Sequence, residues 1–130
     1  MELPDNQLFI MFKRDLELEK NWGKLLEGLR ETIGKKPADL NGVLFLIGVQ
    51  ELGKGNKIFS KEQKQDLMHI AICKVLSYAG FYELDFTDQD GWPHWKLTKD
   101  LPRFDLLDQE KLLKLQILEY FEREYQIIIE

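Results

Sequence analysis

The stretch Gly80-Phe-Tyr-Glu-Leu-Asp-Phe-Thr-Asp-Gln-Asp-Gly-Trp-Pro-His-Trp-Lys-Leu-Thr98 decides the fold, because it predicts a β-hairpin together with its register. Two alternating runs, 81–87 and 92–98, flank a turn-forming loop at residues 88–91. If Thr87 pairs with Trp92, the apolar residues of both strands share one face. That face is expected to contain Tyr82, Leu84, Phe86, Pro93, Trp95 and Leu97.

The other face of the predicted hairpin pairs opposite charges. The same register sets Asp85 opposite His94 and Glu83 opposite Lys96. A slip of one residue would move apolar side chains to the charged face, so the pattern specifies one register. A lone hairpin is only marginally stable in water, and its apolar face must therefore pack on helices.

Helical periodicity covers much of the chain before the hairpin. Residues 5–33 repeat apolar residues at helical spacing, but Gly23 and Gly28 weaken the pattern. We therefore expect two helices that meet near residues 16–20. The apolar run 8–12 is also compatible with a short strand.

A further helix is expected over residues 39–52, with Asp39 or Asn41 as its N-cap and Gly53 after its end. Its middle, 43–49, is apolar on every side, so neighbours must surround it. A buried strand would show the same run, and the length of the segment favours the helix.

Two more helices have clear start signals. Ser60 and Gln63 form a capping-box pattern that predicts a helix over residues 61–79, ended by Gly80. The last helix is expected to begin after Asp105 or Asp108.

These segments predict a mostly helical α+β fold in a single domain of residues 1–130, with four to five helices and one antiparallel β-hairpin before the C-terminal helix. The order of elements over residues 20–98 resembles that of a winged helix. The resemblance implies nucleic-acid binding, with Lys61, Lys64 and Lys74 facing phosphates.

Two features of the sequence oppose that role. The tip of the wing would carry Asp88 and Asp90, which repel phosphate, and the connector 53–59 is longer than the usual helix-turn-helix turn. The chain has 23 acidic and 18 basic residues, a net charge of −5 that argues against nucleic acid as a partner.

The composition is that of a globular protein of the cytoplasm. Cys73 is the only cysteine, so no internal disulfide forms. The first residues lack the positively charged region of a secretory signal, and the longest apolar run is too short to span a bilayer. We therefore expect a cytoplasmic protein with no membrane association.

One loop is a candidate anion site. Lys54, Gly55, Lys57 and Lys61 combine positive charge with loop amides and a helix N-terminus, which attract phosphate or carboxylate groups. The spacing matches neither the P-loop nor the dinucleotide fingerprint. A glycine turn followed by a solvated basic face explains the same residues.

No motif predicts catalysis. His69 and Cys73 lie four apart on one helix, but a zinc site needs three or four ligands. We therefore expect a small packed thiol and a histidine at the border of the apolar face. The acids around Asp88 and Asp90 fail the EF-hand pattern. We therefore expect a non-catalytic protein that has no metal and no cofactor.

The sequence favours an interaction or regulatory module, with a protein partner or a second copy as its binding partner. A winged-helix nucleic-acid-binding protein and an anion-binding protein or enzyme remain alternatives. In the predicted register Trp92 points to the charged face. The alternative is that a helix, the N-terminal one, covers this side chain. The candidate partner-binding residues are Trp92, Tyr125, Ile127, Ile128 and Ile129.

Overall fold

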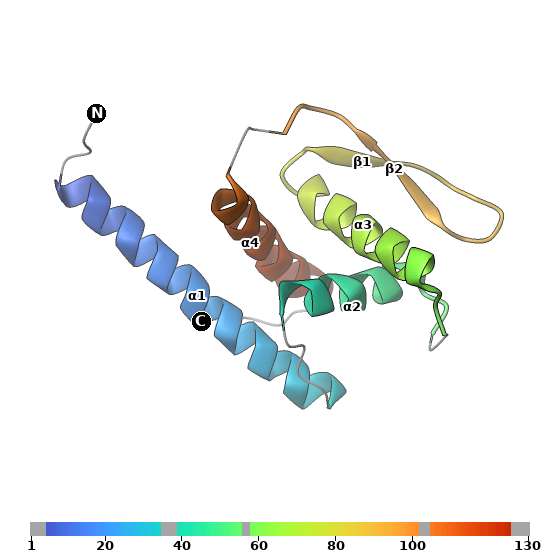
Figure 1. Ribbon diagram of the computed structural model, residues 1–130, viewed down its shortest axis with the longest axis horizontal. Helices are drawn as coiled ribbons and strands as arrows, with labels where there is room; N and C mark the ends of the chain where they lie inside the picture. The colour runs from blue at the N-terminus through green and yellow to red at the C-terminus, as the bar shows by residue number, and fades with distance from the viewer. Residues whose placement is uncertain (1–4, 35–38, 56–57, 102–104, 126–130) are drawn as a thin grey trace.

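A computed structural model describes residues 5–34, 39–55, 58–101 and 105–125, and for residues 5–9, 11–12 and 33 it describes the backbone alone. The elements follow in the order α1 (Asp5–Ile33), α2 (Leu40–Leu52), α3 (Lys61–Ser77), β1 (Tyr82–Thr87), β2 (Pro93–Leu97) and α4 (Leu106–Tyr125) (Figure 1). The predicted fold class, mostly helical with one antiparallel hairpin before the C-terminal helix, is confirmed.

α1 is one continuous helix, so the predicted junction near residues 16–20 is wrong, as is the strand alternative for 8–12. Its C-terminal part lies in the main core through Trp22, Leu25 and Leu29. Burial of these side chains outweighs the cost of about 1 kcal/mol that a helical glycine brings.

α2 and α3 cross at very short range. A Cβ atom on Gly48 would lie 2.2 Å from the carbonyl oxygen of Leu67, so only glycine permits this approach. Asp39 caps α2 by accepting a hydrogen bond from the Gly42 N–H, and Gly53 follows the helix with a left-handed φ of 70°. The helical interpretation of residues 43–49 is confirmed.

The predicted caps of α3 and α4 are also confirmed. Ser60 and Gln63 exchange both hydrogen bonds of a capping box at the start of α3. The side chain of Asp105 accepts a hydrogen bond from the Asp108 N–H at the start of α4. α3 ends at Ser77, two residues earlier than predicted, and Gly80 follows with a φ of 82°.

The hairpin register is correct in its first half and wrong in its second. Tyr82 pairs with Leu97, Glu83 with Lys96 and Leu84 with Trp95, as predicted. Beyond Leu84 a bulge shifts the pairing, so that Phe86 faces His94 and Thr87 faces Pro93. The predicted pairs Asp85/His94, Phe86/Pro93 and Thr87/Trp92 do not form.

The loop explains the shift. Gly91 donates to the carbonyl oxygen of Asp88 and has a φ of 85°, while the Asp88 N–H donates to Trp92. This is a three-residue loop in which a left-handed glycine follows a tight turn. The loop therefore closes at Asp88 and Trp92 rather than at Thr87, and the bulge at Asp85 absorbs the extra residue.

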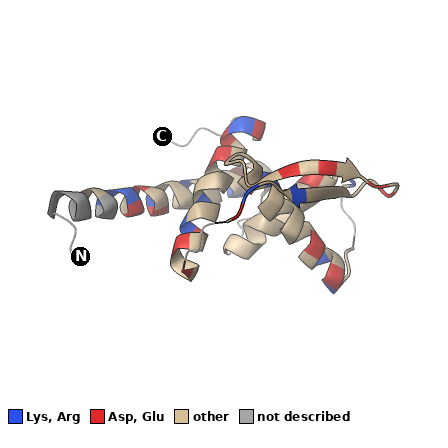
Figure 2. Cartoon of the chain, turned by 90° about the horizontal axis from the view of Figure 1, so that it is seen from above, with Lys and Arg blue, Asp and Glu red and all other residues tan. Residues whose placement is uncertain are grey.

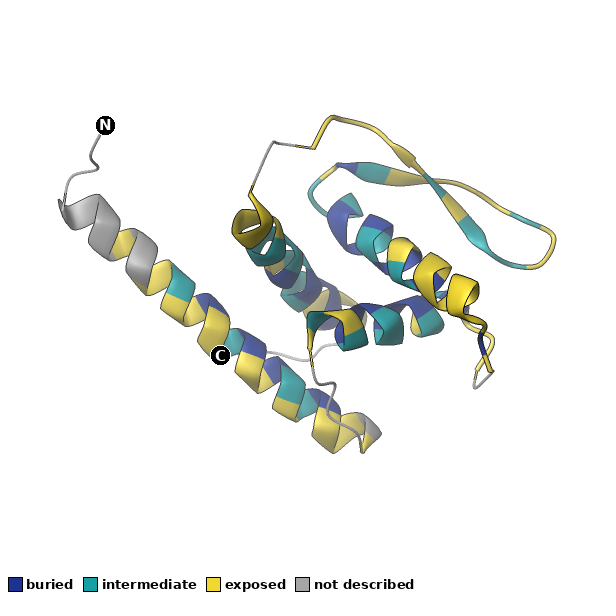
Figure 3. Ribbon diagram, in the orientation of Figure 1, coloured by how far each residue is buried: buried dark blue, intermediate teal, exposed yellow. Residues whose placement is uncertain are grey.

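The helices share one core, and the hairpin lies over α3 (Figures 1 and 3). A smaller cluster of Leu52, Phe59 and Leu67 packs against Trp92. A helix partly covers Trp92, as considered from the sequence, but α2 and α3 contribute the cover rather than the N-terminal helix. Leu84 and Leu97 stay about half exposed, at 50% and 51%, so the hairpin's apolar face is only partly buried.

Candidate functional site

One residue of the predicted anion loop, Lys54, contacts the hairpin. Lys54 donates a hydrogen bond to the carbonyl oxygen of Asp90. Gly55 has a left-handed φ of 70°, and Lys61 is exposed in the first turn of α3. Lys57 lies outside the described residues. Anion binding by this loop stays a prediction.

Asp88 organises the hairpin tip, residues 88–92. Its Oδ1 atom accepts hydrogen bonds of 2.9 Å from the N–H groups of Asp90 and Trp92, and its Oδ2 atom lies 2.9 Å from Nε2 of His94. The His94 ring stacks on Phe86 at 4.4 Å between centroids. These contacts replace the Asp85/His94 pair that the sequence predicted.

A groove of about 300 Å³ lies between the hairpin tip and α3, lined by Asp66, His69, Asp88, Trp92 and His94 among others. The hydrogen bond to His94 is the largest cause that holds the pKa of Asp88 below its ordinary value. Among the described residues, no group of three or more His, Cys, Asp or Glu side chains is placed to hold a metal ion. The groove thus contains an ordinary acid–imidazole pair.

Cys73 is not a reactive thiol. Its side chain is buried, and burial raises its pKa to about 11, so the thiol keeps its proton at neutral pH. Its Sγ atom lies 3.6 Å from Nε2 of His69. The sequence-based expectation of a packed thiol beside a border histidine agrees with this geometry.

A polar network joins α2, α3 and α4. The buried Tyr120 donates to Glu51 at 2.9 Å, and Lys74 lies 3.8 Å from Glu51 and 3.4 Å from Glu124. Tyr78 donates to Glu124 at 2.8 Å. Burial raises the pKa of both tyrosines, and the Tyr78 hydroxyl holds the pKa of Glu124 below its ordinary value. The network has an evident structural role.

An apolar pocket of about 230 Å³ lies among the C-terminal parts of α1, α2 and α4. Leu29, Ile47, Tyr120 and Phe121 form its buried walls. Tyr125, a predicted partner-binding residue, lines it with 41% of its surface exposed. The other predicted residues of that group, Ile127, Ile128 and Ile129, lie outside the described residues.

A third cavity runs between α1 and α4, and we call it the α1–α4 groove. Its volume is about 490 Å³. The apolar part is made by Leu18, Leu115 and Leu118, and charged residues of both signs surround it. Leu115 is 52% exposed. The charged residues are Arg14, Asp15, Glu17, Asp108 and Lys111.

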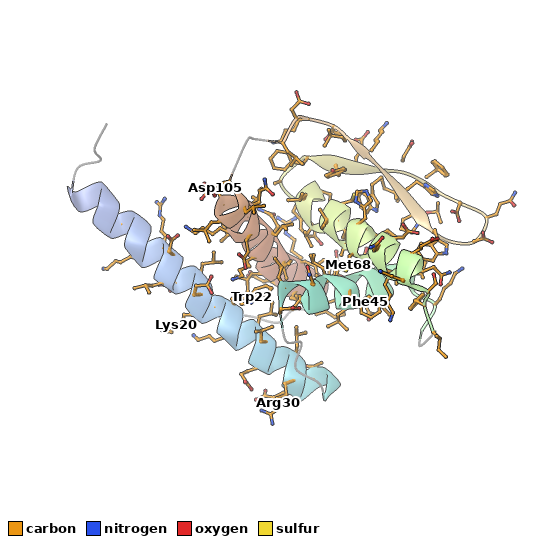
Figure 4. All side chains as sticks on the ribbon, viewed as in Figure 1. Lys20, Trp22, Arg30, Phe45, Met68 and Asp105 are labelled. Atoms are coloured by element: carbon orange, nitrogen blue, oxygen red, sulfur yellow. The ribbon has the colours of Figure 1, made fainter. Side chains whose placement is uncertain are left out.

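Ion pairs hold the two helices on either side of this groove. Lys111 lies 2.9 Å from Asp15, and Lys114 lies 3.0 Å from Glu19. Lys114 also stands 5.5 Å above the ring of Trp22, which lies between α1 and α4 (Figure 4). The spacing of α1 and α4 is therefore set by specific contacts.

Exposed apolar residues continue the groove at its open end. Ile10, one helical turn before Arg14, is 46% exposed, and Leu107, one turn before Lys111, is 60% exposed. The part of α1 before its contact with α4 stands clear of the other elements (Figure 1). This surface was missed from the sequence, although the apolar run 8–12 was its signal.

This chain matches no protein-family model, and no match is found among curated proteins or solved structures. None of the described helices is long and apolar enough to cross a membrane. The functional argument therefore depends on the geometry of these surfaces.

Proposed function

We propose that this protein is a non-catalytic interaction module that associates with a second copy of itself through the α1–α4 groove. One observation carries the proposal: beside the groove between α1 and α4, the first part of α1 extends past the other helices (Figure 1). An apolar helix laid in such a groove is a recurring mode of protein recognition.

The N-terminal segment of α1, residues 5–12, has the composition of a buried helix. It includes Leu-Phe-Ile-Met-Phe at positions 8–12. Five consecutive helix positions, at about 100° apart, are distributed over the whole circumference of the helix. A helix that is apolar on all sides normally has neighbours on all sides. The exposed Ile10 is the described member of this run.

The segment and the groove also match in length and in charge. The α1 wall of the groove extends over residues 14–21, as many residues as the segment 5–12 contains, or about 12 Å at 1.5 Å per residue. Asp5 is the single charged residue of the segment. Residues 6–12 therefore bring no charge into the groove that contains Leu115 and Leu118.

A two-fold axis allows the segment of each copy to occupy the groove of the other. If the two α1 helices run antiparallel, residues 5–12 of each copy lie over residues 14–21 of the other. Each copy then provides one segment and one groove, which is the self-complementary contact that two-fold symmetry requires. Leu107 and Leu115 become covered in the same step.

The remaining described cavities support a non-catalytic role. The groove at the hairpin tip has an acid–imidazole pair whose carboxylate is already occupied by three hydrogen bonds. The acidic residues along β1 and at the tip (Figure 2) also weigh against nucleic-acid binding at this wing.

The oligomeric state tests the proposal. We expect a dimer by light scattering and analytical ultracentrifugation. Ile10→Glu and Leu115→Glu should each raise the dissociation constant at least about tenfold, because a charge would enter the apolar contact. Leu84→Glu is the matched control, since Leu84 is 50% exposed but lies on the hairpin. A wild-type chain that stays monomeric at all concentrations would contradict the proposal.

Cross-linking tests the antiparallel arrangement. A chain with Ile10→Cys is mixed with a chain with Leu115→Cys and treated with a short bifunctional thiol reagent; the buried Cys73 does not interfere. The mixed pair should cross-link more than Ile10→Cys with itself. The reverse order would indicate parallel α1 helices.

A further inference from the structure

The outer edge of β1 is a strand edge without a neighbour. In the part of the chain that the structure describes, β1 and β2 pair only with each other, and the hairpin lies over α3 (Figure 1). Every residue of β1 after Tyr82 is exposed, including Leu84 at 50%. β2 begins with Pro93, which has no N–H group to donate. β1 therefore offers the better edge for a further strand.

The hairpin register shows which backbone groups face this edge. The Thr98 N–H donates to the carbonyl oxygen of Phe81, so these two residues form a hydrogen-bonded pair. Such pairs alternate along an antiparallel ladder with pairs that exchange no hydrogen bond. Tyr82 and Leu84 belong to the second kind and direct their N–H and C=O groups away from β2. The bulge beyond Leu84 ends the regular ladder, so a further strand would pair with residues 82–84.

The side chains along this edge are negatively charged. Residues 81–95 contain four acidic residues and no lysine or arginine. Lys96 of β2 lies 3.0 Å from Glu83. The hydrogen bond to Glu83 and, after it, the charge of Asp85 raise the pKa of Lys96, so both carboxylates lie near the same ammonium group. One lysine thus faces two carboxylates, and this face of the hairpin keeps an excess of negative charge.

We propose that the edge of β1 binds an extended segment of a partner protein in which basic and apolar residues alternate. The segment adds a third strand to the hairpin, a recurring mode of recognition in which main-chain hydrogen bonds give affinity and alternate side chains give specificity. An apolar residue opposite Leu84 covers the exposed half of that side chain. The neighbouring residues of the segment point to the other face, where a lysine or arginine meets Glu83 and Asp85.

A second copy of the chain is a poorer occupant of this edge. Two paired β1 strands would bring Glu83 and Asp85 of one copy against the same carboxylates of the other, and like charges across a strand pair are destabilising. Pairing of β1 with β2 of another copy would leave a free edge at each end and would continue without closure. The inference thus goes beyond the proposed dimer and does not depend on it.

Synthetic peptides test the inference on the full chain. The probe is a short capped peptide in which lysine and valine alternate. The same peptide with glutamate in place of lysine should bind at least about tenfold more weakly, because its charges repel the edge. The same peptide with every backbone amide methylated should lose binding, since it keeps the charges but has no hydrogen-bond donors. Methylated and unmodified peptides of equal affinity, or a lysine peptide that does not bind, would overturn the inference.

Hydrogen exchange measured by NMR locates the bound peptide. The N–H groups of Tyr82 and Leu84 should exchange at least about tenfold more slowly when the lysine peptide is bound, because they become donors to it. The N–H of Glu83, which already faces β2, is the internal control and should change less. Protection confined to α1 or α4 would place the peptide elsewhere and contradict the inference.

A charge reversal tests the negative edge. Asp85→Lys should raise the dissociation constant of the lysine peptide at least about fivefold. Glu31→Lys is the matched control, because Glu31 is exposed on α1 and the change in net charge is the same. Equal affinities of the Asp85→Lys variant and the wild type would contradict the proposed charge match.

The two proposals fail separately. Ile10→Glu, which should weaken the dimer, should bind the lysine peptide like the wild type. Assemblies of the wild type that are larger than a dimer and that the lysine peptide breaks up would show that a second copy occupies β1, and they would overturn the inference.

Discussion

At the scale of single residues, Asp88 determines the shape of the hairpin tip. Its carboxylate accepts hydrogen bonds from two backbone N–H groups and faces His94. Aspartate favours such turns because its short side chain reaches the backbone two residues on. The loop that results sets the position of Trp92 against Leu52, Phe59 and Leu67.

Replacement of Asp88 should therefore loosen the tip. Asp88→Ala removes all three contacts, whereas Asp88→Asn keeps an acceptor for the backbone, so Tm should fall from wild type to Asn to Ala. Thermal unfolding at pH 7 measures this order. A variant with alanine that melts like the wild type would contradict the role of the carboxylate.

The stabilisation by Asp88 should also depend on pH. In the folded protein, the hydrogen bonds from His94 and from the Trp92 N–H hold the pKa of the Asp88 carboxyl group below its ordinary value of 3.8. A lowered folded-state pKa gives stability that is present above the unfolded-state pKa and lost as pH falls through the folded-state pKa. The Tm difference between wild type and Asp88→Asn should shrink in that acidic range. A difference that stays constant down to pH 2 would exclude this linkage.

Gly48 is the second decisive residue. Alanine there would place a Cβ atom 2.2 Å from the backbone of Leu67, so α2 and α3 would have to separate. We expect Gly48→Ala to cost about 1–3 kcal/mol of unfolding free energy in urea titrations. Gly23→Ala is the control: its Cβ has no neighbour within 4 Å, and it should stabilise α1 by up to about 1 kcal/mol. Equal stability of Gly48→Ala and wild type would refute the close crossing.

At the scale of elements, each helix depends on contacts that its own sequence does not contain. α4 lies on the core through Ile117, Tyr120 and Phe121. Its Tyr120 donates a hydrogen bond to Glu51 in α2, and its Glu124 forms an ion pair with Lys74 in α3. The hairpin is joined to α3 by packing and to the loop after α2 by Lys54. The polar network therefore sets how three helices meet.

Tyr120→Phe tests this network. The change removes one hydrogen bond to a carboxylate and leaves Glu51 with a weaker set of partners, which should cost about 1.5–3 kcal/mol in chemical unfolding. Tyr82→Phe, in the hairpin and outside the network, is the matched control and should have little effect. A similar loss of unfolding free energy in both variants would contradict a specific role of the Tyr120 hydroxyl in this network.

At the scale of the whole molecule, α1 has two different halves. The second half belongs to the core through Trp22, Leu25 and Leu29, whereas the first extends past α4 with Ile10 exposed. Helical periodicity covers both halves in the sequence, but it did not show that one half is buried and that the other is exposed. The proposed dimer assigns the first half a neighbour.

Local chemistry predicted much of the fold. The cap at Ser60, the end of α2 at Gly53 and the first three hairpin pairs depend on neighbours close in sequence, and they were predicted correctly. Asp39 and Asp105 were each one of two predicted caps, and the structure shows both in that role. The candidate sites depend on residues that are distant in the chain. Lys54, predicted to bind an anion, donates a hydrogen bond to the carbonyl oxygen of Asp90, a contact between distant residues that the sequence did not indicate.

The sequence by itself determined which segments are helices, where most of them begin and end, and that one hairpin precedes the last helix, because capping, turn chemistry and periodicity act over a few residues. Only the tertiary structure decided the rest. The continuity of α1, the close crossing at Gly48, the cover on Trp92 and the groove between α1 and α4 arise where distant segments meet, and their free energy comes from packing that no short stretch of sequence contains. The hairpin depends on both. Its alternating pattern specified the pairing of the first half, whereas the loop that Asp88 organises shifts the pairing of the second half by one residue.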